Sequence, residues 1–319
     1  MTRIAYVHDL SYALGEQAAD IQKAETDGLL VSEPKALESA GFARHFRAAD
    51  DTSAYDLAVR AVEPMESELA QTDAIVYSTC IPANANLGNE ERFRVTRDVK
   101  YLMDFPASRL QNHFGLRDAF VVGLNQQACT GMLGSLRLAH NLIRAEPEIR
   151  KVLCVTSDRF PHGALYEQSY NLISDGAAAC LVSVEPTGFR YVGVHAVTNG
   201  AMVMATDDQT VGSFFNYTHD LIRACVDKAG IGINEIDWFV PQNTNVKAWQ
   251  ILARLLGMDF ERVYLSTLSE VGHVISGDNI VNLKHLEQSG KLKPGHLVLL
   301  VMAGYGSNWQ CVILEKTAS

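Results

Sequence analysis

Short apolar segments rich in valine, isoleucine and aromatic residues alternate along this chain with longer segments of helical periodicity. Such an alternation is typical of α/β layering, in which helices cover the faces of a sheet. Several apolar segments are almost continuously hydrophobic, which indicates strands buried on both faces. Strands are expected at residues 3–8, 74–78, 119–123, 151–156, 177–184, 191–196, 238–241, 263–265, 297–302 and 310–315. Helices are expected at residues 53–71, 130–144, 214–229, 246–256 and 279–288.

A turn at residues 185–188, with the sequence Glu-Pro-Thr-Gly, divides the chain into two parts. Each part begins with strands, continues with helix–strand units and ends in a pair of strands. We therefore predict two related α/β halves that share one core, at residues 1–186 and 187–319. The stretch 79–115, which carries several basic residues, is longer than a plain connection and indicates a cover over a site or an interface.

The charge and the cysteine content exclude several classes of protein. Acidic residues outnumber basic residues 37 to 27, and the net charge of −10 argues against a general nucleic-acid binder. No apolar run approaches the roughly 18–20 residues that span a bilayer, and the first residues lack a secretory signal, so we expect a cytoplasmic protein without a membrane partner. The six cysteines are scattered without a Cys-x-x-Cys pair, which favours reduced thiols over a disulfide framework.

One cysteine stands at a position that favours reactivity. In the segment 121–136 an apolar strand leads into polar residues, then Cys129, and then a helix whose first turns carry Gly131 and Gly134. Small residues allow close packing, so we expect this helix to be central and buried. A thiol at the start of a helix lies near the positive end of the helix dipole, which favours the nucleophilic thiolate. The alternative is that Cys129 is only a small buried residue.

This segment resembles the nucleophile elbow of the β-ketoacyl-acyl-carrier-protein synthase III family, a branch of the thiolase fold. Five further segments resemble family motifs in the same order along the chain. They correspond to an early helix, a Gly-Asp-Gly-Ala turn, a Val-Pro-His-Gln-Ala-Asn segment, a Gly-Asn position and a C-terminal glycine loop, at residues 56–61, 174–178, 237–245, 271–273 and 303–309. The resemblance implies an α/β thiolase fold with two pseudo-repeated halves in a layered αβαβα arrangement, and a homodimer.

Two departures from the family pattern change the expected chemistry. The condensing enzymes use a Cys-His-Asn set, whose His and Asn donate hydrogen bonds to the enolate formed as carbon dioxide leaves. Here Gln242 stands at the family's His position and His273 at its Asn position. Glutamine can donate a hydrogen bond but cannot act as a base, whereas histidine can. The residues therefore indicate a nucleophile with a base in place of an enolate-stabilising pair.

Asp278 lies five residues beyond His273, in the segment Gly-His-Val-Ile-Ser-Gly-Asp-Asn. This segment resembles that of synthase-III-like acyltransferases with a Cys-His-Asp triad. A carboxylate that binds one imidazole nitrogen fixes the tautomer and leaves the other nitrogen to take a proton. Asp278 could instead cap the helix that follows, or do both. Asp175 is a weaker alternative for the third member, because its turn resembles a structural loop of the family.

The resemblance also implies an oxyanion hole and contacts to the substrate. Backbone N–H groups of Cys129 and Gly306 would form the hole, and glycine at position 306 permits close approach of a substrate. Substrate contacts are expected from the amide side chains of the segment 237–245, namely Gln242, Asn243 and Asn245.

Polar residues just before the elbow have open roles, and no cofactor motif is present. Gln127 could bind the acyl group or the dimer partner, or only satisfy the local backbone. The sequence contains no dinucleotide-binding, P-loop or His-Glu-x-x-His motif, so we expect neither a metal nor a redox cofactor. The donor would be a thioester of coenzyme A or of the phosphopantetheine of an acyl carrier protein.

These observations favour an acyltransferase that moves an acyl group through Cys129 to a small alcohol or amine activated by His273. The resemblance places such enzymes in secondary metabolism, including antibiotic biosynthesis. One alternative is a decarboxylative condensing enzyme in which Gln242 and His273 both donate to the enolate. Another is a catalytically inactive thiolase-fold scaffold. The basic residues of segment 92–100 could bind an acidic carrier protein or form a solvated helix face.

Overall fold

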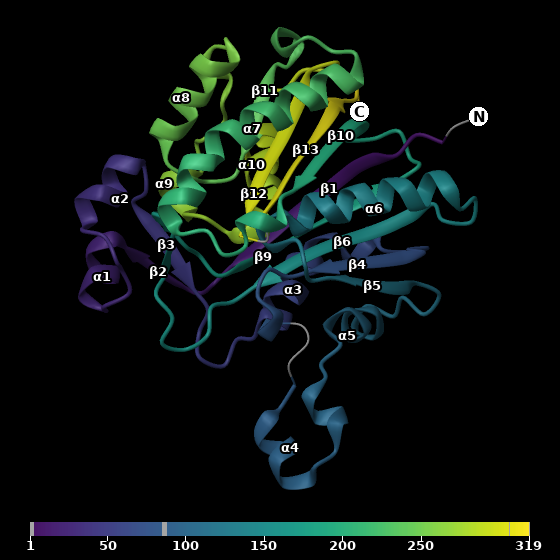
Figure 1. The fold of residues 1–319 in the computed structure, drawn as a ribbon. Helices are drawn as coiled ribbons and strands as arrows, with labels where there is room; N and C mark the ends of the chain where they lie inside the picture. Colours follow the sequence, from purple (N-terminus) through teal and green to yellow (C-terminus); the bar gives the residue numbers. More distant parts are fainter. Residues whose placement is uncertain (1–2, 85–87, 306, 319) are drawn as a thin grey trace.

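A mixed sheet of nine strands, in the order β11-β12-β13-β10-β1-β9-β6-β4-β5, forms the frame of the molecule (Figure 1). The computed structural model describes residues 3–84, 88–305 and 307–318. The strands of this sheet are β1 Tyr6–Leu14, β4 Ala74–Ser78, β5 Phe120–Leu124, β6 Lys151–Asp158, β9 Gly176–Ser183, β10 Phe189–Thr198, β11 Trp238–Pro241, β12 Leu297–Gly304 and β13 Asn308–Lys316. The α-helices of the described ranges are α1 Ile21–Thr26, α2 Pro34–Ala40, α3 Ala54–Val62, α4 Glu90–Thr96, α5 Pro106–His113, α6 Gly131–Ala145, α7 Asp207–Ala229, α8 Val246–Leu256, α9 Leu268–Val271 and α10 Asp278–Gln288.

The strand pairing repeats itself in the two parts of the sheet. In the N-terminal part, β1 and β9 are antiparallel, β9 and β6 are antiparallel, and β6 and β4 are parallel. The C-terminal part follows the same pattern with β10, β13, β12 and β11. The two parts of the sheet meet where β1 pairs with β10, and this ladder has two residue pairs within the described ranges. The boundary predicted at residue 186 falls in the turn between β9 and β10.

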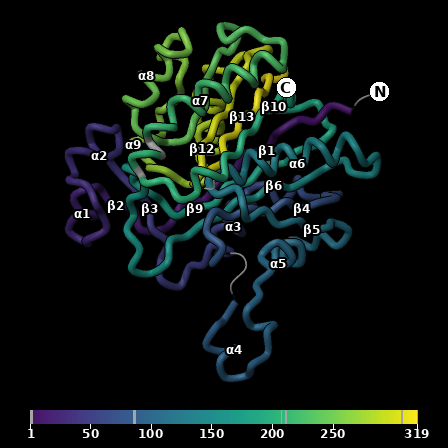
Figure 2. Tube along the Cα trace, viewed as in Figure 1, coloured from purple at the N-terminus to yellow at the C-terminus, as the bar shows by residue number. Residues whose placement is uncertain are grey.

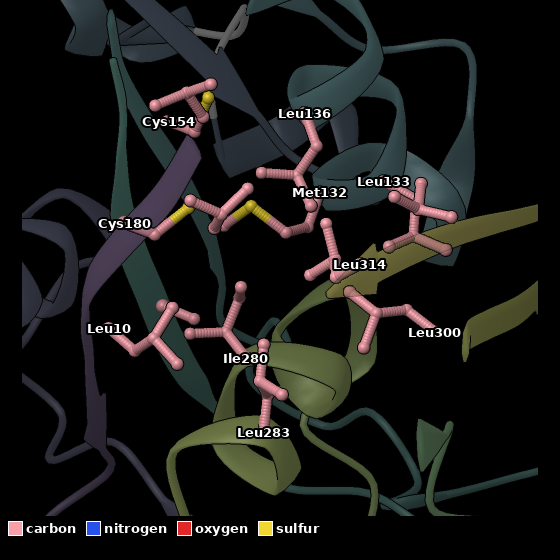
Figure 3. Packing of buried hydrophobic residues seen from close by; sticks show 14 of the residues in the cluster. Leu10, Met132, Leu133, Leu136, Cys154, Cys180, Ile280, Leu283, Leu300 and Leu314 are labelled. Carbon is pink, nitrogen blue, oxygen red and sulfur yellow. The ribbon is translucent and has the colours of Figure 1, made fainter. Parts of the chain in front are cut away.

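Six of the helices form three layers around the two parts of the sheet. The apolar residues of α6 and α10 lie between them, and Figure 3 shows Met132 and Leu136 of α6 in the same cluster as Ile280 and Leu283 of α10. One outer layer packs α3 and α5 on β4, β6 and β9, and the other packs α7 and α8 on β11, β12 and β13. This is the αβαβα arrangement of the thiolase fold, as the sequence analysis predicts.

Local signals explain where two helices differ from their predicted bounds. The first helix begins with a capping box between Ser53 and Asp56, but its α-helical part ends at Val62 because Pro64 has no backbone N–H. The remaining residues form a 3-10 turn, Glu63–Glu68. The helix predicted from residue 214 begins earlier, at Asp207, after a capping box between Thr206 and Gln209.

The strand predicted at 263–265 is wrong. Val263 makes a single parallel bridge to Phe239 of β11. At the equivalent place in the N-terminal part, β4 pairs with a full strand, β5. The sequence analysis also missed two small two-stranded sheets, which are β2 Gln17–Asp20 with β3 Arg44–Arg47, and β7 Glu167–Gln168 with β8 Asn171–Leu172.

The segment after β4 forms an arm that projects from the body of the molecule at α4 (Figure 2). Apolar side chains are exposed along it, with Val95 85% and Phe105 59% exposed. Two of its basic residues pair locally, since Arg94 binds Glu90 and Lys100 binds Asp98. Across the described ranges, no helix combines the length and the apolar character that a membrane crossing requires.

Candidate active site

Cys129 lies at a strained turn between β5 and α6. It is the middle residue of the 3-10 turn Ala128–Thr130, and Ala128 has a left-handed φ of 44°. Two hydroxyl groups hold the turn: Thr130 Oγ1 donates to Gln127 O at 2.7 Å and Ser276 Oγ donates to Ala128 O at 3.0 Å. The nucleophile candidate is therefore fixed at the start of a buried helix.

His273 is held by a backbone conformation that only glycine adopts readily. Gly272 has φ 66° and ψ −156°, and a Cβ there would lie 2.9 Å from the carbonyl oxygen of Leu172. The next residue bridges to the same segment: His273 N donates to Leu172 O at 2.8 Å, and Ser174 N donates to His273 O at 2.9 Å. These bonds fix the backbone position from which the imidazole extends.

Asp278 binds the imidazole from behind. Its Oδ2 lies 2.5 Å from Nδ1 of His273, and its Oδ1 accepts a hydrogen bond from the backbone N of Val274 at 2.6 Å. The side chain is fully buried. α10 begins at Asp278 itself, and its N-cap, Gly277, makes no side-chain cap bond. Asp278 is therefore a positioning group for His273 and not the N-cap of its own helix.

Asp175, the weaker alternative, makes a different set of bonds. Its carboxylate accepts hydrogen bonds from the backbone N of Ala48, the backbone N of Phe160 and the hydroxyl of Tyr166. It joins loops around β9 and does not contact the imidazole.

A buried polar network surrounds Asp278. The backbone N of Asn243 donates to Oδ2 of Asp278 at 2.6 Å. Asn243 Nδ2 donates to the Gly272 carbonyl at 2.8 Å, and its Oδ1 accepts from Asn282 Nδ2 at 3.0 Å. Asn243, which the sequence analysis places among the substrate contacts, is fully buried and is not among the cavity-lining residues. It supports the carboxylate and the segment before His273.

A cavity of about 550 Å³ opens onto the sulfur and the imidazole. Gln242 and Asn245 line it, and Gln242 Oε1 accepts a hydrogen bond from the backbone N of Ala303 at 2.6 Å, which leaves Nε2 as the amide group for the cavity. Most other lining side chains are apolar, among them Ile81, Phe160, Ile173, Phe214, Phe215, Ile251 and Trp309.

Two other predicted site residues are placed differently. Gln127 is not a lining residue, because its Oε1 accepts a hydrogen bond from Gln310 Nε2 at 2.8 Å and lies where a Cβ on Gly134 would be. Gly306, the second predicted oxyanion-hole donor, lies outside the described residues. Its neighbour Gly304 approaches the elbow so closely that a Cβ there would lie 3.0 Å from Cys129 N.

The electrostatics around Cys129 favour an ion pair with His273. A hydrogen bond from the Cys80 thiol lowers the pKa of Cys129. Burial opposes this shift and the His273 imidazole adds to it, and the pKa falls to about 5. Burial opposes a charge on His273, but the Asp278 carboxylate and the Cys129 sulfur raise the pKa of the imidazole to about 10. Since Nδ1 faces Asp278, Nε2 is the nitrogen that faces the sulfur.

Cys80 is the functional candidate that the sequence analysis missed. It lies just beyond the end of β4 and lines the same cavity as Cys129. Because β4 and β5 are parallel neighbours, their carboxyl ends meet at one edge of the sheet. The position of a cysteine directly after the strand 74–78 was the available signal.

Comparison with known proteins agrees with this geometry. The family model described as "3-Oxoacyl-[acyl-carrier-protein (ACP)] synthase III" matches residues 125–200, which include Cys129. The model of its C-terminal part matches residues 226–316, which include Gln242, His273 and Asp278. The two matches together span more than half of the chain.

Individual relatives are distant in sequence and similar in fold. The β-ketoacyl-[acyl-carrier-protein] synthase III of Chlamydia caviae is 23% identical over 81% of this chain and 80% of the relative. The crystal structure of FabH, the synthase III of Pseudomonas aeruginosa PAO1, has a TM-score of 0.82 at 22% identity and covers 99% of both chains. ChlB3, described as an acyltransferase, has a TM-score of 0.81 at 19% identity over 98% of both chains. The protein therefore belongs to the 3-oxoacyl-[acyl-carrier-protein] synthase III family of thiolase-fold enzymes.

Proposed function

We propose that this enzyme transfers an acyl group from a coenzyme A or carrier-protein thioester, through Cys129, to an alcohol or amine. The observation that carries the proposal is the 2.5 Å contact between Asp278 Oδ2 and His273 Nδ1, which leaves Nε2 for the sulfur of Cys129. A carboxylate-bound imidazole beside a thiol can move protons in both directions, which acyl transfer to oxygen or nitrogen requires.

The first step would load the acyl group. The Cys129 thiolate attacks the thioester carbonyl, a carbon–sulfur bond to Cys129 forms, and the bond to the donor sulfur breaks. The departing thiolate takes the proton from Nε2 of the His273 imidazolium. The products are a free donor thiol, an acylated Cys129 and a neutral imidazole.

The second step would use that neutral imidazole as a base. The charge on the Cys129 sulfur is one cause of the raised pKa of His273, and acylation removes it. Nε2 can then accept the proton of a hydroxyl or amine as this group attacks the acyl carbon. The intermediate collapses and releases Cys129 as a thiolate beside an imidazolium, so the protons balance over the cycle.

The cavity supports a largely apolar substrate with one anionic region. Its apolar lining suits an acyl chain or an apolar acceptor. Among the described lining residues, Lys247 is the only lysine, arginine, aspartate or glutamate. An ammonium at this position suits a phosphate of coenzyme A or an acidic carrier protein, whereas the basic residues 92–100 lie on the projecting arm.

We further propose a homodimer that uses the free edge of the sheet. Of the described strands, β5 is the last in the sheet order, next to β4, and its Phe120 is 41% exposed. The projecting arm adds exposed apolar side chains. A second copy of the chain could pair with this edge and cover the arm.

Decarboxylative condensation is the second candidate, because Gln242 Nε2 and the His273 imidazole both face the cavity and could donate to an enolate oxygen. Release of carbon dioxide from a malonyl thioester would distinguish this reaction from simple acyl transfer.

Intact-protein mass spectrometry with a panel of thioesters tests the proposal. We expect an adduct on Cys129, no adduct in Cys129→Ala, and an adduct that persists in His273→Ala because transfer is blocked. An adduct on another cysteine would contradict the proposal, as would an unmodified protein with every thioester, which would favour the inactive scaffold.

A further inference from the structure

Three side chains from separate segments form a closed ring of hydrogen bonds beside the His273–Asp278 pair. Asn243 Nδ2 donates to Thr267 Oγ1 at 3.2 Å, the Thr267 hydroxyl donates to Asn282 Oδ1, and Asn282 Nδ2 donates to Asn243 Oδ1 at 3.0 Å. In chain order, the three residues follow β11, precede α9 and lie within α10. Thr267 is buried, and both amides are fully buried. The reaction steps proposed above use none of these three side chains.

The ring leaves one N–H on each amide, and both of these bind backbone carbonyls. Asn243 Nδ2 donates to the Gly272 carbonyl at 2.8 Å, and Asn282 Nδ2 donates to the Pro241 carbonyl at 2.9 Å. Each amide nitrogen therefore uses both of its protons within the protein. A flipped amide would place its oxygen against the carbonyl oxygen that the nitrogen now binds. The network therefore permits one orientation of each side chain, and it is rigid as a unit.

Asn243 binds both members of the pair. Its backbone N–H donates to Asp278 Oδ2 at 2.6 Å, and its side chain binds the carbonyl of the Gly272–His273 peptide. The N–H of that same peptide donates to Leu172 O at 2.8 Å, so the peptide that carries the imidazole is bound on both sides. Both oxygens of the Asp278 carboxylate accept backbone N–H groups, which makes Nδ1 of His273 the donor in their contact.

We propose that Asn243, Thr267 and Asn282 act as one positioning unit, which holds the peptide that carries His273 against the Asp278 carboxylate and so maintains the 2.5 Å contact between Nδ1 and Oδ2. None of the three is among the described residues that line the cavity, so they act through the imidazole and not on the substrate. Their role in turnover rests on the proposed function, whereas their role in holding the imidazole does not.

Proton NMR of the protein without any substrate tests this role. The Nδ1–H of His273 is buried in a short hydrogen bond to a carboxylate, so it should give a far-downfield resonance that is protected from exchange with water. His273→Gln identifies the resonance by its loss. Thr267→Val keeps the approximate size of the side chain but removes the hydroxyl that two bonds of the ring share, and it should abolish the resonance. Thr267→Ser retains the hydroxyl and should keep the resonance.

Thr72→Val is the matched control, because Thr72 is also buried and its hydroxyl donates to Leu69 O at 2.7 Å, away from the cavity. It should lose similar thermal stability and keep the resonance. Asn282→Ala opens the ring at a second position and should abolish the resonance. The proposal would be overturned by a resonance that persists in either folded ring variant. Loss of the resonance in Thr72→Val or Thr267→Ser, or its absence from the unaltered protein, would also overturn it.

The rate of acyl transfer separates this inference from the proposed function. In single turnover from preloaded Cys129, Thr267→Val should slow transfer by roughly 10–100-fold, as for a small misplacement of a reacting group, and Thr72→Val should not. A rate in Thr267→Val within a few-fold of the unaltered enzyme would overturn the role in turnover. If no thioester acylates Cys129 while the resonance is lost only in the ring variants, the proposed function fails and the positioning of the imidazole stands.

Discussion

The two halves of the molecule present the same local structure at the candidate site and carry different side chains on it. In the N-terminal half, Ala128 with φ 44° opens a 3-10 turn that leads into the buried helix α6. In the C-terminal half, Ile275 with φ 50° opens the 3-10 turn Ile275–Gly277 that leads into the buried helix α10. The two turns contact each other, and Ser276 donates a hydrogen bond to Ala128.

The side chains at these matched turns differ completely. The N-terminal turn carries the Cys129 thiol, whereas the C-terminal turn is flanked by His273 and Asp278. The repeated fold therefore brings two helix starts together, and in the function proposed above the residues at each start decide which one supplies the nucleophile and which one holds the base. The fold alone does not decide the reaction.

Removing the charge at the C-terminal turn should have the largest effect. Asp278→Asn keeps the size of the side chain but loses the carboxylate that holds Nδ1 of His273. We expect the rate of acyl transfer to fall by a factor of about 10²–10⁴, because the imidazole is no longer held in one tautomer and its basicity falls. Single-turnover release of the acyl group from preloaded Cys129 measures this step, and a rate within a few-fold of the unaltered enzyme would contradict the role of Asp278.

The pH profile of acyl loading should reflect the ion pair between the two turns. The pKa of Cys129 is lowered to about 5 and that of His273 is raised to about 10, so loading should be nearly constant between these values. Loading should fall as the pH drops through about 5, because the thiolate takes a proton. It should fall again as the pH rises through about 10, because the imidazolium that protonates the leaving thiolate is lost. A rate that climbs steadily from pH 7 to 9, as for an ordinary thiol, would contradict the ion pair.

The pKa shifts of His273 and Cys129 also determine how the stability of the fold depends on pH. The raised pKa of His273 stabilises the fold below its ordinary value near 6.5, and this contribution is lost as the pH rises through about 10. The lowered pKa of Cys129 stabilises the fold above its ordinary value near 9, and this contribution is lost as the pH falls through about 5.

Removing the hydrogen bond between the two turns should have a moderate effect on stability and on the rate of acyl transfer. Ser276→Ala removes the hydrogen bond to the Ala128 carbonyl, and we expect it to lower the free energy of unfolding by about 1 kcal/mol and to slow acyl transfer. Ser135→Ala is the control, because its equally buried hydroxyl donates only to Gly131 O within α6. It should cost similar stability in denaturant unfolding without slowing transfer, and equal rate losses in both variants would remove the special role of Ser276.

Substitution of the left-handed residues themselves should have the smallest effect on acyl transfer, and the resulting changes in stability should differ in sign. Ala128→Gly relieves the left-handed strain of a small side chain, so we expect stabilisation of up to about 1 kcal/mol. Ile275→Gly relieves the same strain but removes a buried side chain from the central cluster, so it should destabilise by about 2 kcal/mol or more. Thermal unfolding measures both, and the same sign for the two would contradict this difference.

The sequence analysis predicts most of the sheet and the central helices, because these have strong local signals. The predicted bounds of β4, β11 and α8 coincide with those of the structure, since each is a short apolar or amphipathic run closed by polar residues or glycine. Residues 263–265 have the same apolar pattern but form only one bridge. Pairing depends on the neighbouring segment, which a local pattern does not contain.

The site residues also divide into those that the sequence identifies and those whose role depends on tertiary contacts. The segments around Cys129, His273 and Asp278 stand out in the sequence because they resemble motifs of the family. The roles of Asn243 and Gln127 cannot be read from the sequence. An amide in a polar segment is the same residue type whether its side chain faces a cavity, as that of Gln242 does, or lies in a buried polar network.

The linear order of residues by itself predicted the layered α/β fold and a division into two halves, and its resemblance to family motifs singled out the thiol, the imidazole and the carboxylate. Only the tertiary structure decided that Asp278 binds the imidazole rather than capping its helix, and that Cys80 lines the same cavity as Cys129. The physical reason is that periodicity and residue type act within a few turns of chain. Contacts between the ends of separate strands and helices exist only after the halves have packed together.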